Sequence, residues 1–450
     1  MDDGVRWAGA ATQARLVAAG EISPEELRAV AVDAIEHVDP SVGAVVAPLF
    51  DRPGDGVPML LKDAGQELAG TPHWVGVAAL RDAGARSMTT TGLVSRFERA
   101  GFSILGKAAC PALSAGATTE PPGFPPTRNP WDPTRSAGGS SGGPAAAVAA
   151  GMVAVAHGSD ATGSLRCPAA LCGVVTLVPT AGLIAGVPPA GQRTDVVWRD
   201  FVLARRVEDL AFVFTALLGT APAPTTGRLR VGLLDHDPEL GLDVHPACRE
   251  AVAVTGRLLE ALGHEVAPGW PAALDHLWAR SFAAFGVISD ATRPPVLRWV
   301  SERLGRPVGP DELDDDVFEA AARAEGRADE DVAAARSVIG SAVAPIERWW
   351  DDHDVLVTPT TFQPAWPLRG DPGFREMGTL LAPFSLTGQP ALSLPLHRTD
   401  PAPGVPALSV GAQLVGRRGD DELLLRLAAD LQAAADWTHL RPPVATPPRA

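Results

Sequence analysis

The chain has 450 residues, of which 46% are hydrophobic, which is enough for a substantial core in one large domain. Its formal net charge of −15 would repel nucleic acids and acidic membranes, so we expect neither as a partner. The N-terminus has no basic region and no apolar signal core, and the longest nearly apolar run, 144–156, is too short to span a bilayer. These features favour a cytoplasmic protein.

The expected elements of the first third alternate between helices and strands. A capping-box pattern at Ser23 begins a helix that continues to about residue 35. The remaining elements are a buried strand at 57–61, a helix at 92–100, a strand at 103–105, a proline-rich irregular loop at 121–133, a helix at 144–150 and a strand at 153–156.

The middle of the chain, about 205–350, is expected to be mostly helical and variable, and its acidic stretch 311–331 reads as a solvated helical surface. Further elements are a strand at 229–234, a helix ending near 262, strands at 355–357 and 408–415, and a helix at 421–434. This alternation predicts an α/β fold with a central sheet. We expect a single domain, 1–439, and a disordered proline-rich tail, 440–450.

The cysteines and histidines give no sign of a metal or cofactor site. The four cysteines, which are Cys110, Cys167, Cys172 and Cys248, contain no C-x-x-C pair and are too few for a disulfide framework. No histidine pair has metal-binding spacing, and His157 is expected to pack structurally. We therefore infer no metal and no cofactor.

Only two of the 38 basic residues are lysines, Lys62 and Lys107. A buried lysine can be neutral near pH 7, whereas an arginine cannot. Lys62 follows the expected buried strand at 57–61. The residues alone leave two interpretations open, a buried base and a surface lysine at a strand end.

A glycine-serine cluster at 138–143 admits four interpretations. A phosphate loop would need a following Gly-Lys-Ser/Thr, which is absent. A nucleophile elbow with Ser140 as nucleophile matches G-x-S-x-G, but it should follow a strand and not a proline-rich loop. The others are a flexible linker and one half of a serine-serine-lysine site. The linker is disfavoured by a second glycine and hydroxyl cluster at 158–164.

Together the two clusters resemble the signature of the amidase signature family. Gly-Gly-Ser-Ser-Gly-Gly at 138–143 is followed by an alanine-rich helix and by Gly-Ser-Asp-Ala-Thr-Gly-Ser-Leu-Arg at 158–166. Further similar segments span nearly the whole chain, at 58–63, 127–132, 172–175, 179–180, 354–359, 386–391 and 411–416. The resemblance implies the amidase signature fold, a central mixed β-sheet covered by helices on both faces.

The resemblance also implies a role for each site residue. Ser164 is the nucleophile that forms an acyl-enzyme, Ser140 bridges it to Lys62 and follows a cis peptide bond, and Lys62 is the base. The backbone amides expected to face the oxyanion belong to Ala161, Thr162, Gly163 and Ser164. The supporting residues are Ser141, Asp160 and Arg166, of which the last two are expected to form an ion pair.

The expected reaction is hydrolysis of a non-peptide C–N bond in a small amide. An esterase or acyltransferase with the same triad, an α/β-hydrolase with a histidine base, and a non-catalytic family member stay open as alternatives. Thr162 stands where the family usually has glycine, which leaves the substrate class open. Tryptophans in three variable segments, 185–198, 278–299 and 362–384, hint at an apolar or aromatic substrate. The oligomeric state is undetermined, and a homodimer is among the options.

Overall fold

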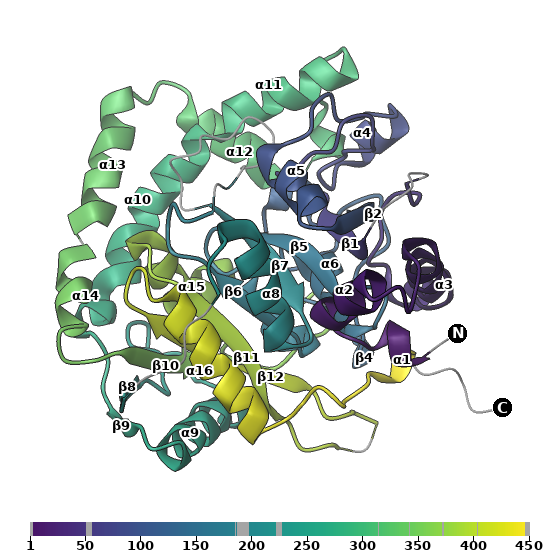
Figure 1. Ribbon diagram of the computed structural model, residues 1–450. Coiled ribbons are helices and arrows are strands. Elements are labelled where there is room, and N and C mark those ends of the chain that lie inside the picture. Colours follow the sequence, from purple (N-terminus) through teal and green to yellow (C-terminus); the bar gives the residue numbers. More distant parts are fainter. Residues whose placement is uncertain are drawn as a thin grey trace.

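The computed structural model describes residues 3–50, 56–184, 186, 198–221, 227–313, 315–341, 343–370, 373–402 and 404–445. In this part of the chain, ten strands form one sheet with the order β2-β1-β5-β7-β6-β11-β12-β10-β8-β9 (Figure 1). The strands are β1 (Val57–Lys62), β2 (Phe102–Ala108), β5 (Val155–Asp160), β6 (Val175–Val178), β7 (Arg199–Ala204), β8 (Arg230–Leu233), β9 (Glu265–Pro268), β10 (Val355–Pro359), β11 (Ala391–Arg398) and β12 (Ser409–Gly416).

The sheet is mixed, as the resemblance implies. Strand β1 is parallel to both β2 and β5, and β8 is parallel to both β9 and β10, whereas the central strands pair antiparallel. Leu61 of β1 pairs with Lys107 of β2 and with His157 of β5. The carboxyl ends of β1 and β5 therefore lie side by side at one edge of the sheet, which brings residue 62 close to residues 158–160.

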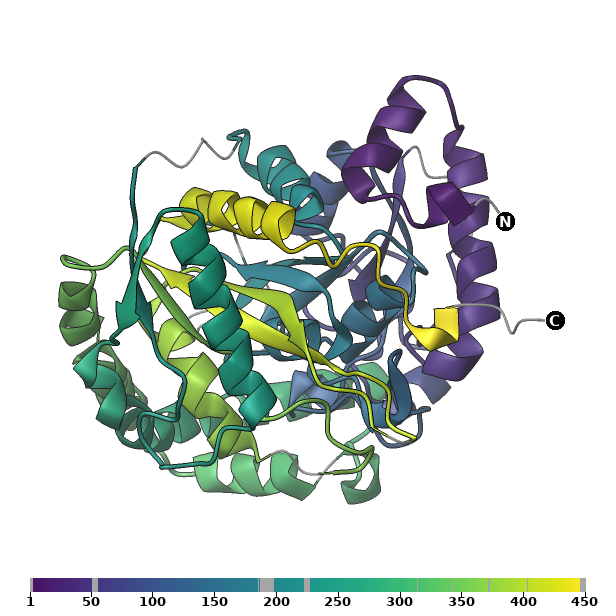
Figure 2. The same cartoon turned by 90° about the horizontal axis from the view of Figure 1, so that it is seen from below.

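Helices cover both faces of the sheet. In Figure 2 the sheet lies between α16 and α8 on one side and the light-green helices of the middle segment on the other. The helices are α1 (Asp3–Arg6), α2 (Ala10–Ala18), α3 (Pro24–Val42), α4 (Ala78–Asp82), α5 (Gly92–Arg99), α6 (Gly142–Ala149), α7 (Arg166–Cys172), α8 (Val207–Leu218), α9 (Pro246–Ala261), α10 (Leu277–Ala291), α11 (Arg293–Leu304), α12 (Asp315–Ala324), α13 (Asp329–Ser341), α14 (Val343–Trp349), α15 (Phe374–Thr387) and α16 (Asp421–Ala434). Short 3-10 turns are η1 (Ala112–Ser114), η2 (Ala272–His276), η3 (Pro310–Glu312) and η4 (Pro443–Ala445).

Helix α6 is the element that links the fold to the site. All of its residues are buried, and the run Ala145–Ala147 has no side chain beyond a methyl group. Such small side chains allow close packing, and α6 contacts β1, β2, β5 and β7. This packing holds the preceding glycine-serine loop against the carboxyl ends of β1 and β5.

The expected capping box is present. The Ser23 hydroxyl accepts a hydrogen bond from the Glu26 amide (3.1 Å), and the Glu26 carboxylate accepts one from the Ser23 amide (2.9 Å). Two free amides at the start of α3 are thereby satisfied, which fixes the helix start where the sequence predicts it.

Several segments differ from expectation, among them strands β6, β7, β9 and β11, which the sequence did not predict. The proline-rich loop at 121–133 contains a two-stranded hairpin of β3 (Arg128–Asn129) and β4 (Asp132–Ser136). On its other side β4 contacts residues 366–368, because the Ser136 amide donates to the Trp366 carbonyl (2.8 Å) and the Leu368 amide donates to the Thr134 carbonyl (3.0 Å). In the expected disordered tail, the described residues include η4, where the Arg6 guanidinium donates to the Ala445 carbonyl (3.4 Å). The rest of that tail, 446–450, lies outside the described residues.

Among the residues that the structure describes, none of the helices has the length and apolar character needed to cross a bilayer.

Candidate active site

Lys62 ends β1 and is fully buried. Its Nζ atom lies 2.7 Å from Ser140 Oγ and 2.9 Å from Ser159 Oγ. Burial lowers the pKa of the Lys62 ammonium to about 8, although the negative charges of Asp200 and Asp160 act in the opposite direction. Desolvation penalises the charged form of an amine, so this lysine is poised to lose its proton near neutral pH.

Ser140 belongs to the loop that precedes α6. The Gly139–Ser140 peptide bond is cis, as the resemblance implies. Ser141 fastens this loop to β5, because its hydroxyl donates to the Ser159 carbonyl (3.1 Å) and accepts from the Ser159 amide (3.2 Å). A Cβ atom at Gly143 would lie 2.3 Å from the Ala109 nitrogen, so glycine is required for this close approach.

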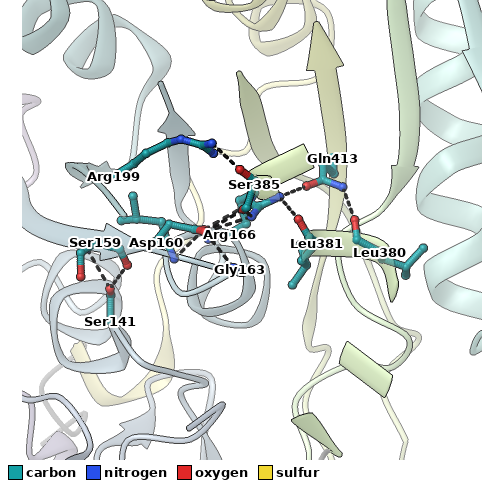
Figure 3. A network of polar contacts seen from close by, with 11 residues as sticks. Ser141, Ser159, Asp160, Gly163, Arg166, Arg199, Leu380, Leu381, Ser385 and Gln413 are labelled. Atoms are coloured by element: carbon teal, nitrogen blue, oxygen red, sulfur yellow. Dashed lines mark hydrogen bonds and ion pairs between the residues drawn. The ribbon is translucent and has the colours of Figure 1, made fainter. Parts of the chain in front are cut away.

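The turn between β5 and α7 is organised by the buried carboxylate of Asp160 (Figure 3). It accepts hydrogen bonds from the amides of Gly163 (2.7 Å) and Leu165 (3.1 Å). Burial alone would raise the pKa of Asp160, but the Arg166 charge and these hydrogen bonds lower it. Gly163 has φ +129°, a conformation that a side chain would disfavour.

Arg166 anchors this turn to two distant elements. Its guanidinium pairs with both carboxylate oxygens of Asp160 (2.9 and 3.1 Å). It also donates to the Gln413 side chain of β12 (2.8 Å), and to Leu381 O (2.8 Å) and Ser385 Oγ (2.6 Å) of α15. Figure 3 shows these partners converging on the guanidinium from separate parts of the chain. The expected Asp160–Arg166 pair is thus present and fully buried.

Ser164 lies beside the Ser140 loop and opens on a pocket. The Ser141 amide donates to the Ser164 carbonyl (3.1 Å), which joins the two expected serine clusters. Ser164 lines a pocket of about 340 Å³ together with Ala161 and Thr162 of the same turn. Of the residues expected at the site, Ala161, Thr162 and Ser164 therefore line the pocket.

The rest of the pocket wall comes from four other parts of the chain. Trp198 and Phe285 contribute aromatic rings, and they belong to two of the three variable segments, 185–198 and 278–299, that the sequence analysis singled out for their tryptophans. Residues 185 and 187–197 of the first segment lie outside the described residues. The remaining lining residues are Leu113, Ser114, Ala115, Gly116, Ser289, Asp290, Thr292, Arg293, Asp316, Ala320 and Arg323.

Backbone strain also marks this pocket. Leu113 and Ser114 have φ values of +54° and +59°, and the Leu113 amide donates to the carbonyl of Val75, whose φ is +46°. Left-handed conformations cost energy in residues with a Cβ atom, most of all in β-branched ones such as valine. Strain of this kind concentrates at functional sites.

His157 has a structural partner, as expected, and is not at the serine cluster. Its Nε2 lies 2.9 Å from the carboxylate of Asp200 on β7, and both side chains are buried. Burial lowers the pKa of His157. Within the described residues, no group of three or more histidine, cysteine, aspartate and glutamate side chains is arranged to hold a metal ion.

The sequence prediction assigned no role to three residues of this network: Ser159, Ser385 and Gln413. Ser159 precedes Asp160 inside the second glycine and hydroxyl cluster, so its position in the sequence could have marked it as a site residue. Ser385 and Gln413 come from α15 and β12, more than 200 residues away along the chain from Arg166. Nothing in their local sequence indicates the contact.

The comparisons with known proteins agree over nearly the whole chain. A family model described as Amidase matches residues 10–425. A 6-aminohexanoate-cyclic-dimer hydrolase of Paenarthrobacter ureafaciens is 34% identical, with 98% of each chain covered. An acylamidase of Rhodococcus erythropolis is 30% identical, again with 98% of each chain covered.

A solved structure is also similar to this chain in its three-dimensional fold. A 6-aminohexanoate cyclic dimer hydrolase in complex with its substrate is 32% identical, with a TM-score of 0.90, and the match covers 98% of this chain and 100% of that chain. The described fold therefore has a close experimental counterpart.

Proposed function

We propose a catalytic mechanism on the premise that this chain belongs to the amidase family and is an amidohydrolase, as the full-length match and the relatives show. The observation that carries the mechanism is the contact of 2.7 Å between Lys62 Nζ and Ser140 Oγ, together with the lowered pKa of that lysine. In the proposed relay, neutral Lys62 takes a proton from Ser140, and Ser140 takes one from Ser164. Serine alone is a weak nucleophile at neutral pH, so the relay generates the attacking oxygen.

Ser164 then attacks the amide carbonyl, and the backbone amides of residues 161–164 stabilise the oxyanion. The turn is rigid before substrate arrives, because Asp160 fixes the amides of Gly163 and Leu165 and is itself held by Arg166. Preorganised donors need no reorganisation at the moment of reaction, which is the condition for effective oxyanion stabilisation. Collapse breaks the C–N bond and expels the amine, which receives through Ser140 the proton held by Lys62, and water then hydrolyses the acyl-enzyme.

The proposed substrate is a small non-peptide amide. The pocket of about 340 Å³ has the size of a small-molecule site and contains Ser164. The relatives named for the 6-aminohexanoate cyclic dimer and for acylamides point to the same class of substrate. A cytoplasmic location and the absence of nucleic-acid or membrane partners stay predictions from composition and charge.

The test is covalent labelling. Wild-type protein treated with a fluorophosphonate or an aryl amide should gain one adduct mass, and peptide mapping should place it on Ser164. Ser164→Ala should abolish the adduct, while Ser341→Ala, which alters an exposed serine on α13, should leave it intact. An adduct on Ser140, or labelling that survives in Ser164→Ala, contradicts the assignment of the nucleophile.

A further inference from the structure

Two chemically different sets of residues line the pocket. Ser164 and Thr162 come from the turn after β5. The other lining residues include Ser289 and Asp290 of α10, Arg293 of α11, and Asp316 and Arg323 of α12. Charged side chains in a pocket wall select polar substrates, so this wall bears on which amide the enzyme accepts.

Arg293 is a cationic group in this wall with unused hydrogen-bonding capacity. A guanidinium has five N–H donors. In the described part of the chain, Arg293 makes one long hydrogen bond, to Ser289 Oγ at 3.5 Å. Burial lowers the pKa of Arg293, and the charges of Asp316 and Asp290 only partly oppose this effect. A partly desolvated cation with free donors is a site for an anion.

The neighbouring carboxylates do not act as the anionic partner of Arg293, so a ligand can take that place. Asp290 is already held by Arg323 through two hydrogen bonds (3.0 and 3.2 Å) and by Arg327 at 3.2 Å. Asp316 is exposed to water, which screens its charge. Neither carboxylate is within 4.0 Å of Arg293 among the described ion pairs. The free donors of Arg293 are therefore available to a ligand in the pocket.

The opposite assignment, recognition of a ligand ammonium by the carboxylates, is weaker. The Asp290 carboxylate is occupied by two guanidinium groups, and Asp316 offers a solvated charge at the rim. The same wall includes the apolar side chains of Phe285 and Ala320. This set of groups fits a ligand that combines an amide, an apolar chain and an anion.

We propose that the enzyme acts on small amides that carry a carboxylate remote from the scissile bond, and that Arg293 binds this carboxylate. The proposal rests on the amidase function proposed above and makes its substrate class narrower. A guanidinium matches a carboxylate in a bidentate geometry, which a lysine cannot reproduce. Arg293 thus serves as a specificity residue and has no part in the chemical step.

The test compares amides that differ only at the remote end. One series places a carboxylate, an isosteric neutral nitro group or an ammonium on the acyl side of an anilide, and a second series places them on the amine side. In at least one series, kcat/KM should favour the carboxylate over the nitro compound by roughly tenfold to a hundredfold, the usual effect of a hydrogen bond to a charged group. Arg293→Gln should remove this preference.

Arg298→Gln is the matched control, because Arg298 is an exposed arginine on the same helix and should keep the preference. Arg293→Lys keeps the positive charge and should retain part of the preference, so it separates the effect of losing the charge from that of a damaged fold. Melting temperatures check that each variant is folded. Equal kcat/KM values for carboxylate and nitro compounds in both series, or a preference that survives in Arg293→Gln, overturns the proposal. A preference for the ammonium overturns it as well.

Titration with hexanoate keeps the two proposals distinguishable. If no amide of either series is turned over, the proposed function fails. Calorimetry of hexanoate binding then tests, independently of turnover, whether Arg293 binds a carboxylate. Binding to wild type that is lost in Arg293→Gln supports the carboxylate site. Absence of binding to wild type counts against it.

Discussion

Lys62 Nζ lies 2.9 Å from Ser159 Oγ, on the strand that neighbours its own, in addition to its contact with Ser140. A neutral amine has two N–H groups and one lone pair. If one N–H is donated to Ser159, the lone pair can face the Ser140 hydroxyl, which is the direction that the proposed proton transfer needs. We therefore propose Ser159 as a positioning residue for Lys62, the proposed base.

The first prediction concerns this contact. Ser159→Ala should lower kcat about tenfold or more with little change in KM, because a misdirected base affects proton transfer and not binding. The hydroxyl also stabilises the ammonium form, so its loss should shift the acidic limb of the pH profile to lower pH. Ser159→Thr, which keeps the hydroxyl, should restore most of the rate. An unshifted pH profile in Ser159→Ala would assign the residue a structural role only.

The second prediction concerns the charge of Lys62. The base acts in its neutral form, and burial lowers its pKa to about 8. Activity should therefore be low below this pKa and should rise as the pH increases through about 8. Lys62→Arg should lose at least about 10²-fold in kcat at pH 8, since a guanidinium stays protonated. Steady-state rates between pH 6 and 10 provide the check, and substantial activity in Lys62→Arg is incompatible with a lysine base.

The third prediction concerns the Asp160–Arg166 pair, which is fully buried. Asp160→Asn should reduce the free energy of unfolding by about 3–5 kcal/mol, because it leaves the Arg166 charge buried without its partner. Glu250→Gln is the matched control. It breaks a pair of similar length (2.6 Å) with Arg257, but the two side chains are 47% and 60% exposed, so the cost should stay below about 1 kcal/mol. Urea unfolding of both variants makes the comparison, and equal losses would contradict it.

The elements with strong local signals were predictable. The helix α16 occupies the predicted range 421–434, and the capping box fixes the start of α3. Strand β11 was missed because Pro395 interrupts its pattern, and a proline argues against a central strand. The sheet accommodates it at a register shift between Leu394 and His397. Sequence patterns describe ideal ladders, so they do not anticipate such an irregularity.

The site residues likewise fall into those that the sequence predicted and those that it did not. The proximity of Lys62 and Ser140, which are 78 positions apart, followed from the family resemblance and not from any local pattern. Arg293 gave no signal, because its significance depends on three helices of the variable middle packing around one pocket. Contacts created only by tertiary packing leave no periodicity or spacing in the sequence from which they could be predicted.

The last prediction concerns Thr162, which stands in the proposed oxyanion turn, at a position where the family resemblance implies glycine. Threonine resists positive φ, so the sequence left open whether the turn is distorted. The described non-glycine residues with positive φ are Val75, Leu113, Ser114 and Arg369, so Thr162 keeps an ordinary backbone, and Gly163 alone takes the unusual dihedral in this turn.

The Thr162 side chain therefore narrows the pocket beside Ser164 and does not weaken the turn. Thr162→Gly should raise kcat/KM for amides with bulky acyl groups while changing the rate on a small ester by less than about threefold, because the amide donors keep their positions. Thr162→Ser, which removes only the methyl group, should show part of the same shift in size preference. A large and uniform rate increase across all substrates in Thr162→Gly would instead mean that the native turn holds its donors out of place, since one misplaced oxyanion donor costs on the order of 10²–10³ in rate.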